Sequence, residues 1–555
     1  MESASIAAQL HEIAMYFELD GDRFRAGAYS KAAKSVEATN MLQRLIDEQR
    51  LAELPGIGPS IARVIGDLAR RGSSIVLESQ RAKWPAVIVE LAQLPYVGAA
   101  KARKLHAALA PTDLDAVAAA CRAQAVRTIA GFGEISERKI LAAIEERRAR
   151  GTRALHVDAE EHARGIALHL RAEPAVRRVE IAGAVRRWLE VAPELAFAVA
   201  TDEPVAVAAR LRAYAASSTS DWLDDGAGVI AGRLADGLRC AIHVAPPAQF
   251  GWALVRATGS PEHVELLRAR AAALGVDLGE LAAPDEADLY RALGLPWIPP
   301  EVRDGDTELG EDFSELLELA DVTTAVHTHT TYSDGKDSID AMARAAHALG
   351  MRAIAITDHS AAASYAGGLD AARLREQAAE IAALTDAPVR ILRGTEADIL
   401  ADGAIDVPPE LLGELDLVIA SVHQRYRLDE DGSTRRIVAA MRQPFFKIWG
   451  HPLGRLVLRR DPLALRFDDV LAAAAESRVA FELNGDPYRL DLEPALARRA
   501  AALGIPFVVS SDAHSARGLG AVRWAVGLAR RARLKKSQVL NALPPDELAA
   551  RIKPL

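Results

Sequence analysis

The chain has 555 residues, of which 50% are hydrophobic and 26% are charged. This composition is typical of a folded protein with several domains and excludes the fibrous and intrinsically disordered classes. The formal net charge is −9, so the overall composition does not indicate a nucleic-acid partner, although residues 1–150 hold 21 Lys and Arg against 18 Asp and Glu.

The cysteine count and the hydropathy indicate the cellular compartment. Cys121 and Cys240 are too few for a disulfide framework or a metal-ligand cluster. The first basic residue is Arg23, and no run approaches the ~18 apolar residues of a membrane span. We therefore expect a cytoplasmic protein with neither signal peptide nor membrane anchor; the sequence identifies no protein partner.

Residues 1–150 are expected to be helical, because apolar residues recur there at spacings of three and four. Three segments share one pattern, a glycine turn between amphipathic helices: Leu54-Pro-Gly-Ile-Gly58, Leu94-Pro-Tyr-Val-Gly98 and Ile129-Ala-Gly-Phe-Gly133. Such turns can aim backbone N–H groups at one phosphate and so contact the DNA backbone. A single turn of this kind is usually plain helix packing, but three on the basic part of the chain favour DNA binding. The expected contacts are Gly56, Gly58, Gly98, Gly131 and Gly133.

The middle of the chain changes to a mixed α/β pattern. Strand-like runs occur at Val179–Gly183, Phe197–Ala200 and Leu238–Val244. The following segment, Glu301–Asp321, holds nine acidic residues and one basic residue, Arg303. This charge pattern predicts a solvated connector.

From Asp321 onward, strands and helices alternate seven times. Repeated βα units predict a parallel sheet, and seven of them predict a closed or nearly closed (β/α)7 barrel. In such barrels the active site lies at the carboxyl ends of the strands. Those ends carry polar residues throughout: His327-Thr-His329, Asp334, Asp358-His359, Glu396-Ala-Asp398, His423, Gly450-His451-Pro452, Glu482-Leu-Asn484 and Asp512-Ala-His514.

The histidines at these ends indicate a metal centre. His327 and His329 are alternate residues of one strand, so both imidazoles can bind one ion. Mixed imidazole and carboxylate ligands without thiolate suit zinc, manganese or iron. The candidate ligands outnumber the four of a structural zinc site, so we expect two or three divalent ions that activate a water to hydroxide and hydrolyse a phosphoester.

With these motifs in this order, residues 321–541 resemble a PHP (polymerase and histidinol phosphatase) domain. The resemblance implies that His327, His329, Glu396 and Asp512 hold one ion, that Glu396 bridges to a second held by His423 and His451, and that Asp334, His359 and His514 hold a third. Arg455 is a candidate phosphate contact, with a structural ion pair as the alternative. Ala325 replaces an aspartate common in the family, but that position is not a ligand.

The whole chain is similar to bacterial DNA polymerase X family proteins that end in a PHP domain. The matching segments are Ile181-Ala-Gly-Ala-Val-Arg-Arg187, Ala257-Thr-Gly-Ser260 and Leu293-Gly-Leu-Pro-Trp-Ile-Pro-Pro300. The resemblance implies a helical domain with the first hairpin (1–75), a fingers-like hairpin domain (76–152), a palm (153–255), a thumb (256–303), an acidic linker (304–320) and the PHP domain (321–555).

The palm departs from this family at the residues that would carry out the polymerase reaction. Its three metal-binding aspartates fall on Glu194, Ala196 and Ala241, and the serine at the triphosphate falls on Ala184. Arg256 and Ala257 replace the aromatic residues at the sugar site, and Val64 replaces the lysine of a deoxyribose-phosphate lyase. A methyl group cannot bind Mg²⁺, so we expect a palm without polymerase activity.

Four hypotheses follow. The first is a metal-dependent 3′-5′ exonuclease and 3′-end phosphoesterase of DNA repair that binds gapped duplex or 3′ ends. The second is a gap-filling polymerase with residual activity, which the missing aspartates disfavour. The third is a small-molecule phosphatase, which leaves the hairpins without a role. The fourth is a non-catalytic DNA-binding scaffold, which the complete ligand set disfavours.

Overall fold

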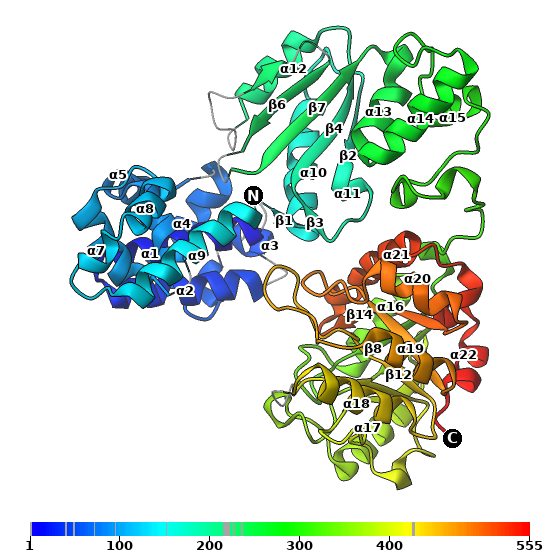
Figure 1. Cartoon of the computed structure of the whole chain (residues 1–555). Coiled ribbons are helices and arrows are strands. Elements are labelled where there is room, and N and C mark those ends of the chain that lie inside the picture. Colours follow the sequence, from blue (N-terminus) through cyan, green and yellow to red (C-terminus); the bar gives the residue numbers. More distant parts are fainter. Residues whose placement is uncertain are drawn as a thin grey trace. The chain divides into compact units, whose positions relative to one another are not determined.

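The computed structural model describes residues 3–38, 42–47, 50–71, 73–94, 96–150, 153–214, 222–224, 226, 228–234, 237–424 and 428–555. The chain divides into two units, Met1–Gly151 and Thr152–Leu555 (Figure 1). In the described parts, no helix combines the length and the apolar character needed to cross a bilayer.

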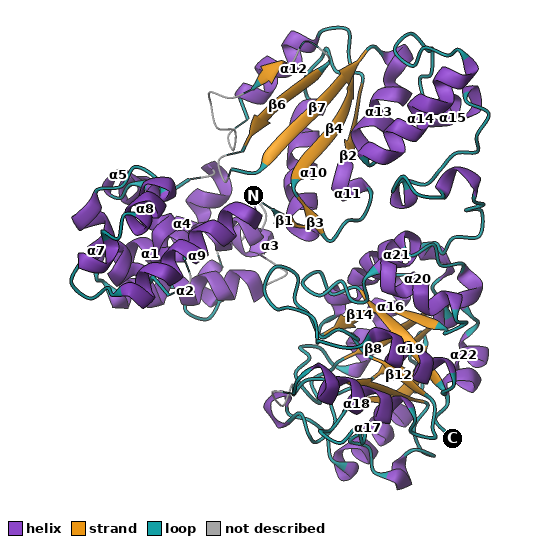
Figure 2. Cartoon of the chain, in the orientation of Figure 1, coloured by secondary structure: helices purple, strands orange, loops and turns teal. Residues whose placement is uncertain are grey.

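The first unit is helical, as predicted (Figure 2). Ile6, Leu10, Ile13 and Phe17 form the buried face of its first helix and are at most 3% exposed. The helices are α1 (Ser3–Asp20), α2 (Arg23–Ala38), α3 (Leu42–Asp47), α4 (Pro59–Arg71), α5 (Ile75–Lys83), α6 (Ala86–Gln93), α7 (Gly98–Leu109), α8 (Leu114–Arg122) and α9 (Glu134–Arg150).

The three predicted hairpin turns immediately precede or open α4, α7 and α9. Gly56 and Gly131 lie in the left-handed region, at φ of 79° and 93°, which is the conformation that selects glycine there. Tyr96 occupies the same place in the second hairpin and adopts φ of 71° without being glycine. The second and third hairpins are neighbours, because Lys139 of α9 lies 4.8 Å above the Tyr96 ring.

A palm-like sheet opens the second unit, and α10 packs against it (Figure 1). Its strand order is β2-β4-β7-β6-β5, with β4 and β7 parallel and the other pairs antiparallel. The sequence predicted β2, β4 and β7 but not β6. The elements are β1 (Ala154–Leu155), α10 (His156–Arg171), β2 (Arg178–Ala182), α11 (Gly183–Arg186), β3 (Val191–Ala192), β4 (Glu194–Ala200), α12 (Pro204–Arg212), β5 (Leu223–Asp224), β6 (Val229–Arg233) and β7 (Arg239–Ala245).

Three thumb-like helices follow: α13 (Phe250–Thr258), α14 (Pro261–Leu274) and α15 (Glu286–Ala292). The acidic segment after them is only in part the solvated connector that its charge predicted. Asp312, Glu315 and Glu318 are exposed. Glu308, however, is fully buried and lies 2.7 Å from Nδ1 of His263, and Arg303 is fully buried against Glu286. The prediction failed at these two residues because α14 and α15 supply partners that the charge pattern of the segment does not contain.

The predicted barrel is present and closed, with parallel strands in the order β10-β11-β12-β13-β14-β8-β9 and helices on its outside (Figure 2). Its strands are β8 (Thr324–Thr328), β9 (Ala353–Ile356), β10 (Arg390–Asp398), β11 (Leu417–Ser421), β12 (Lys447–Trp449), β13 (Val479–Asn484) and β14 (Phe507–Ala513). Its helices are α16 (Ile339–Ala348), α17 (Ala371–Ala383), α18 (Glu430–Met441), α19 (Phe467–Ala475), α20 (Pro494–Ala502), α21 (Val522–Arg531) and α22 (Pro545–Ile552).

Candidate metal centre

The carboxyl ends of the barrel strands bring the nine predicted ligands together. They fall into four overlapping groups, within each of which the ligand atoms lie within 4.8 Å of one another. The groups are His329, Asp334, His359 and His514; His327, His451 and Asp512; His327, His329 and Glu396; and His359, Glu396 and His423.

Glu396 lies at the middle of this cluster. Its Oε1 is 3.3 Å from Nε2 of His327, 3.3 Å from Nε2 of His423 and 2.9 Å from Nε2 of His451. Its Oε2 is 3.0 Å from Nδ1 of His359. A carboxylate that faces imidazoles on both oxygens is placed to bridge two ions.

Two aspartates lie at opposite ring nitrogens of His329. Asp512 Oδ1 is 3.3 Å from its Nε2, and Asp334 Oδ1 is 3.9 Å from its Nδ1. Asp334 is also 3.4 Å from Nε2 of His514. Its side chain is 35% exposed and that of His514 is 38% exposed, whereas His329 is buried. The centre therefore opens to solvent on the side of Asp334 and His514.

The buried ring nitrogens fit divalent ions. Five of them are buried and accept or donate no hydrogen bond: Nε2 of His327, both ring nitrogens of His329, Nδ1 of His359 and Nδ1 of His451. Buried polar groups in proteins are almost always bonded, and metal coordination would satisfy such atoms.

The electrostatics favour cations as well. Burial alone would lower the pKa of His359, but the carboxylates of Glu396 and Asp334 raise it to about 10. Burial likewise opposes protonation of His423, yet Glu396 and Asp398 raise its pKa to about 9. The carboxylates therefore favour positive charge at these two imidazoles, which a bound cation would also supply.

The backbone is strained at three of the candidate ligands. His327, His451 and Asp512 have φ of 63°, 25° and 50°, values that residues with a side chain rarely adopt. Strain of this kind persists where surrounding structure enforces it and is concentrated at functional sites.

Outer partners orient the ligands, and the sequence did not assign them this role. Glu482 Oε1 lies 2.5 Å from Nδ1 of His327, and Asp398 is hydrogen-bonded to Nδ1 of His423. Asp358 accepts hydrogen bonds from N and Oγ1 of Thr330. All three carboxylates are polar strand ends by sequence, and the resemblance leaves them outside the ligand set. The structure adds the contacts that they make.

Arg455 has a structural role, which the sequence left open as the alternative to a phosphate contact. Its guanidinium donates to Glu190 at 2.6 Å, to Glu493 at 2.8 Å and to the carbonyl oxygens of Arg489 and Leu490. The residue is 6% exposed, so its donors are committed within the fold.

The three palm positions that match the polymerase aspartates lie on the neighbouring strands β4 and β7, but two of them carry no group that could bind a metal. Ala196 pairs with Ala241, and Glu194 pairs with Arg239 across the parallel strands β4 and β7. Ala196 packs in an apolar cluster with Phe250 and Ala257. Glu194 is the sole carboxylate of the three positions, and the Arg239 guanidinium lies 3.9 Å from it.

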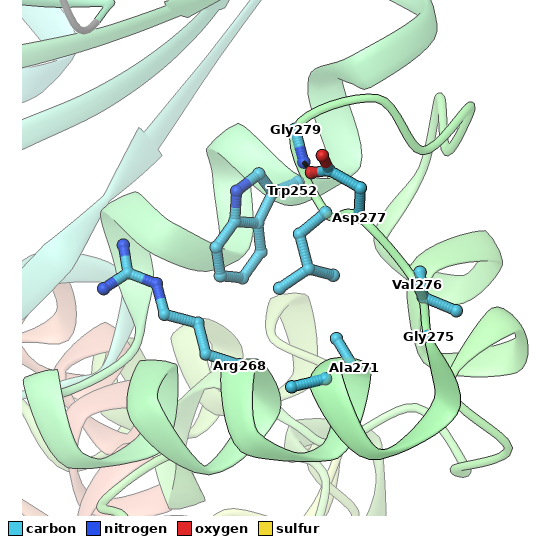
Figure 3. Close-up of a pocket in the computed structure, with 9 residues that line it drawn as sticks. Trp252, Arg268, Ala271, Gly275, Val276, Asp277 and Gly279 are labelled. Atoms are coloured by element: carbon cyan, nitrogen blue, oxygen red, sulfur yellow. Dashed lines mark hydrogen bonds between the residues drawn. The ribbon is translucent and has the colours of Figure 1, made fainter.

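A separate open pocket of about 550 Å³ lies in the thumb (Figure 3). Trp252, Arg268 and Asp277 are among the residues of its wall. The Arg268 guanidinium lies 6.0 Å from the centroid of the Trp252 ring. Asp277 is the one carboxylate among its lining residues, so this pocket offers no metal-ligand set.

Family models match five segments of the chain. They are a helix-hairpin-helix domain (1–74), a SAM-like helix-hairpin-helix tandem (88–146), a DNA polymerase beta thumb (253–304), a PHP domain (325–485) and a PHP-associated region (495–543).

Similar proteins are of two kinds. The DNA polymerase/3′-5′ exonuclease PolX of Bacillus subtilis (strain 168) is 34% identical over 571 residues, covering 100% of both chains. Probable phosphatases of Thermoanaerobacter sp. (strain X514) and Caldanaerobacter subterraneus subsp. tengcongensis are 29% and 32% identical over 232 residues, covering 39% of this chain and 88% and 85% of theirs.

Proposed function

Because the chain belongs to the DNA polymerase X family, among the members that end in a PHP domain, we propose that it is a metal-dependent 3′-5′ exonuclease and 3′-end phosphoesterase of DNA repair. The observation that carries the proposal is the contrast between its two candidate metal sites. The barrel brings nine candidate ligands together, Glu396 among them, whereas the three matching palm positions hold a single carboxylate, that of Glu194.

In this proposal the nine candidate ligands hold three ions. His327, His329, Glu396 and Asp512 would hold one ion, Glu396, His423 and His451 a second, and Asp334, His359 and His514 a third. Zinc, manganese or iron at these positions would polarise the phosphodiester and activate water. Glu482 and Asp398 fix the orientation of His327 and His423, so that each imidazole presents Nε2 to the centre.

The hairpins supply the affinity for DNA in this proposal. Their turns at Gly56, Gly58, Gly98, Gly131 and Gly133 would contact backbone phosphates of a gapped duplex or of a 3′ end. Lys101 and Lys139 lie beside Tyr96 and add positive charge to the same surface. The buried free thiols of Cys121 and Cys240 suit a reducing cytoplasm.

An exposed aromatic ring at the barrel favours a nucleotide over a small phosphate. Tyr365 is 68% exposed, and its ring centroid lies 6.4 Å from those of both His359 and His423. A nucleobase next to the scissile phosphate would stack on such a ring.

A small-molecule phosphatase is the second candidate, because the probable phosphatases match the barrel alone. One experiment separates the two. Metal-loaded protein is incubated with a 5′-labelled oligonucleotide, a 3′-labelled one and p-nitrophenyl phosphate. The proposal predicts a ladder of 5′-labelled products and early release of the 3′ label. Turnover of p-nitrophenyl phosphate alone would contradict it and support the second candidate.

A further inference from the structure

We infer that Arg489 is the residue that binds the scissile phosphate beside the metal centre. The inference deepens the proposed function and rests on it for the identity of the reaction. Its starting observation is that Nε of Arg489 lies 3.5 Å from Oδ2 of Asp512, a candidate ligand.

Arg489 comes from the loop that joins β13 to α20, on the same end of the barrel as the ligands. Its side chain is 20% exposed, so the guanidinium is partly desolvated and still reached by solvent. A charge in this environment binds an anion more strongly than one on the open surface.

The donors of Arg489 are not committed elsewhere. Among the described residues, its one ion pair within 4.0 Å is with Asp512. The 3.5 Å between Nε and Oδ2 is too long for a strong hydrogen bond. Arg455 is the opposite case, because its guanidinium is used by two carboxylates and two carbonyl oxygens. Of the two arginines, Arg489 is therefore the one with N–H groups to offer to a substrate.

The surrounding structure holds Arg489 in place. Arg455 donates to the carbonyl oxygens of Arg489 and Leu490, and Val457 donates its N–H to the carbonyl oxygen of Tyr488 at 2.7 Å. Gly485 begins the loop, where a Cβ would lie 2.4 Å from the carbonyl oxygen of Ala521. The loop is therefore fixed at its start and around Arg489, and Arg455 acts as a positioning residue for Arg489.

A planar guanidinium at this point suits a phosphodiester. Its N–H groups can donate two parallel hydrogen bonds to the non-bridging oxygens, and it keeps its charge at all relevant pH values. The ion pair with Asp512 limits the freedom of the guanidinium before the substrate arrives.

The test compares Arg489→Gln and Arg489→Lys with wild type and with Arg344→Gln, which removes an arginine that is 55% exposed on α16. Three quantities are measured on the full chain: the metal content, the affinity for inorganic phosphate by calorimetry, and kcat and KM for a 3′-labelled oligonucleotide. Metal content and phosphate affinity do not depend on turnover.

We expect Arg489→Gln to keep its ions, to lose about tenfold or more in phosphate affinity and to lose about 10²–10³ in kcat/KM. Arg489→Lys should recover part of both, because it restores the charge without the fork. Unchanged phosphate affinity, or loss of the ions from Arg489→Gln, would overturn the inference. A metal-loaded wild type that cleaves no DNA would overturn the proposed function instead, while the phosphate titration would still test Arg489.

Discussion

The carboxylate of Glu482 lies 2.5 Å from Nδ1 of His327, and this contact fixes which ring nitrogen faces the metal centre. Both side chains are fully buried, so neither can exchange this partner for water. The contact joins β13 to β8, with β14 between them in the barrel. The barrel therefore sets the orientation of this candidate ligand.

Replacing Glu482 by Gln should weaken metal binding by about 10–100-fold, because the amide holds the imidazole less firmly and supplies no charge to it. Calorimetric titration of the chelator-treated protein with Mn²⁺ measures the loss. Glu476→Gln, at the exposed end of α19, is the control and should bind as wild type does. Equal affinity in both variants would show that Glu482 does not orient a ligand.

Tyr365→Ala should raise KM for an oligonucleotide about tenfold and leave turnover of p-nitrophenyl phosphate unchanged. The reason is that base stacking on an aromatic ring contributes ~1–3 kcal/mol, and the small substrate has no base to stack. Steady-state kinetics with both substrates measure the difference. A proportional loss on both would mean that Tyr365 supports the metal ligands His359 and His423 rather than the substrate.

Gly131→Val should weaken DNA binding, since valine is strained at φ of 93° and the third hairpin turn would have to change shape. The slope of log affinity against log salt should fall by about one for each phosphate that the altered turn no longer binds. Gly27→Ala in α2 is the matched control, because a Cβ there meets no atom within 4 Å. An unchanged salt slope for Gly131→Val would assign the hairpin a purely structural role.

The palm should not extend a primer. In the Asp512→Ala background, where products would not be degraded, we expect no nucleotide addition with Mg²⁺ or Mn²⁺. Ala196 and Ala241 offer no metal ligand at the two positions where polymerase chemistry needs a carboxylate. A primer-extension gel measures this. Template-directed products in that background would support the gap-filling alternative.

The barrel and the grouping of the candidate ligands could be predicted from the sequence, because both follow from local patterns. His327 and His329 alternate along the chain at the end of β8, and most other ligands lie at or shortly after a strand end, so topology alone brings them together. Roles that depend on distant partners could not be predicted. Arg455 meets Glu190 across 265 positions of sequence, and the segment around Glu308 is buried by His263 from α14.

The proposal that the barrel is a metal-dependent nuclease is tested by measuring bound metal and nuclease activity on the same single variants. Wild type, His329→Ala and Asp512→Ala are purified, their bound metal is measured by mass spectrometry, and shortening of a 5′-labelled oligonucleotide is followed on a gel. We expect two or three ions and stepwise 3′-end shortening for wild type. For both variants we expect fewer ions and a loss of about 10³ or more in rate at unchanged folding. Undiminished shortening by both variants would contradict the proposal.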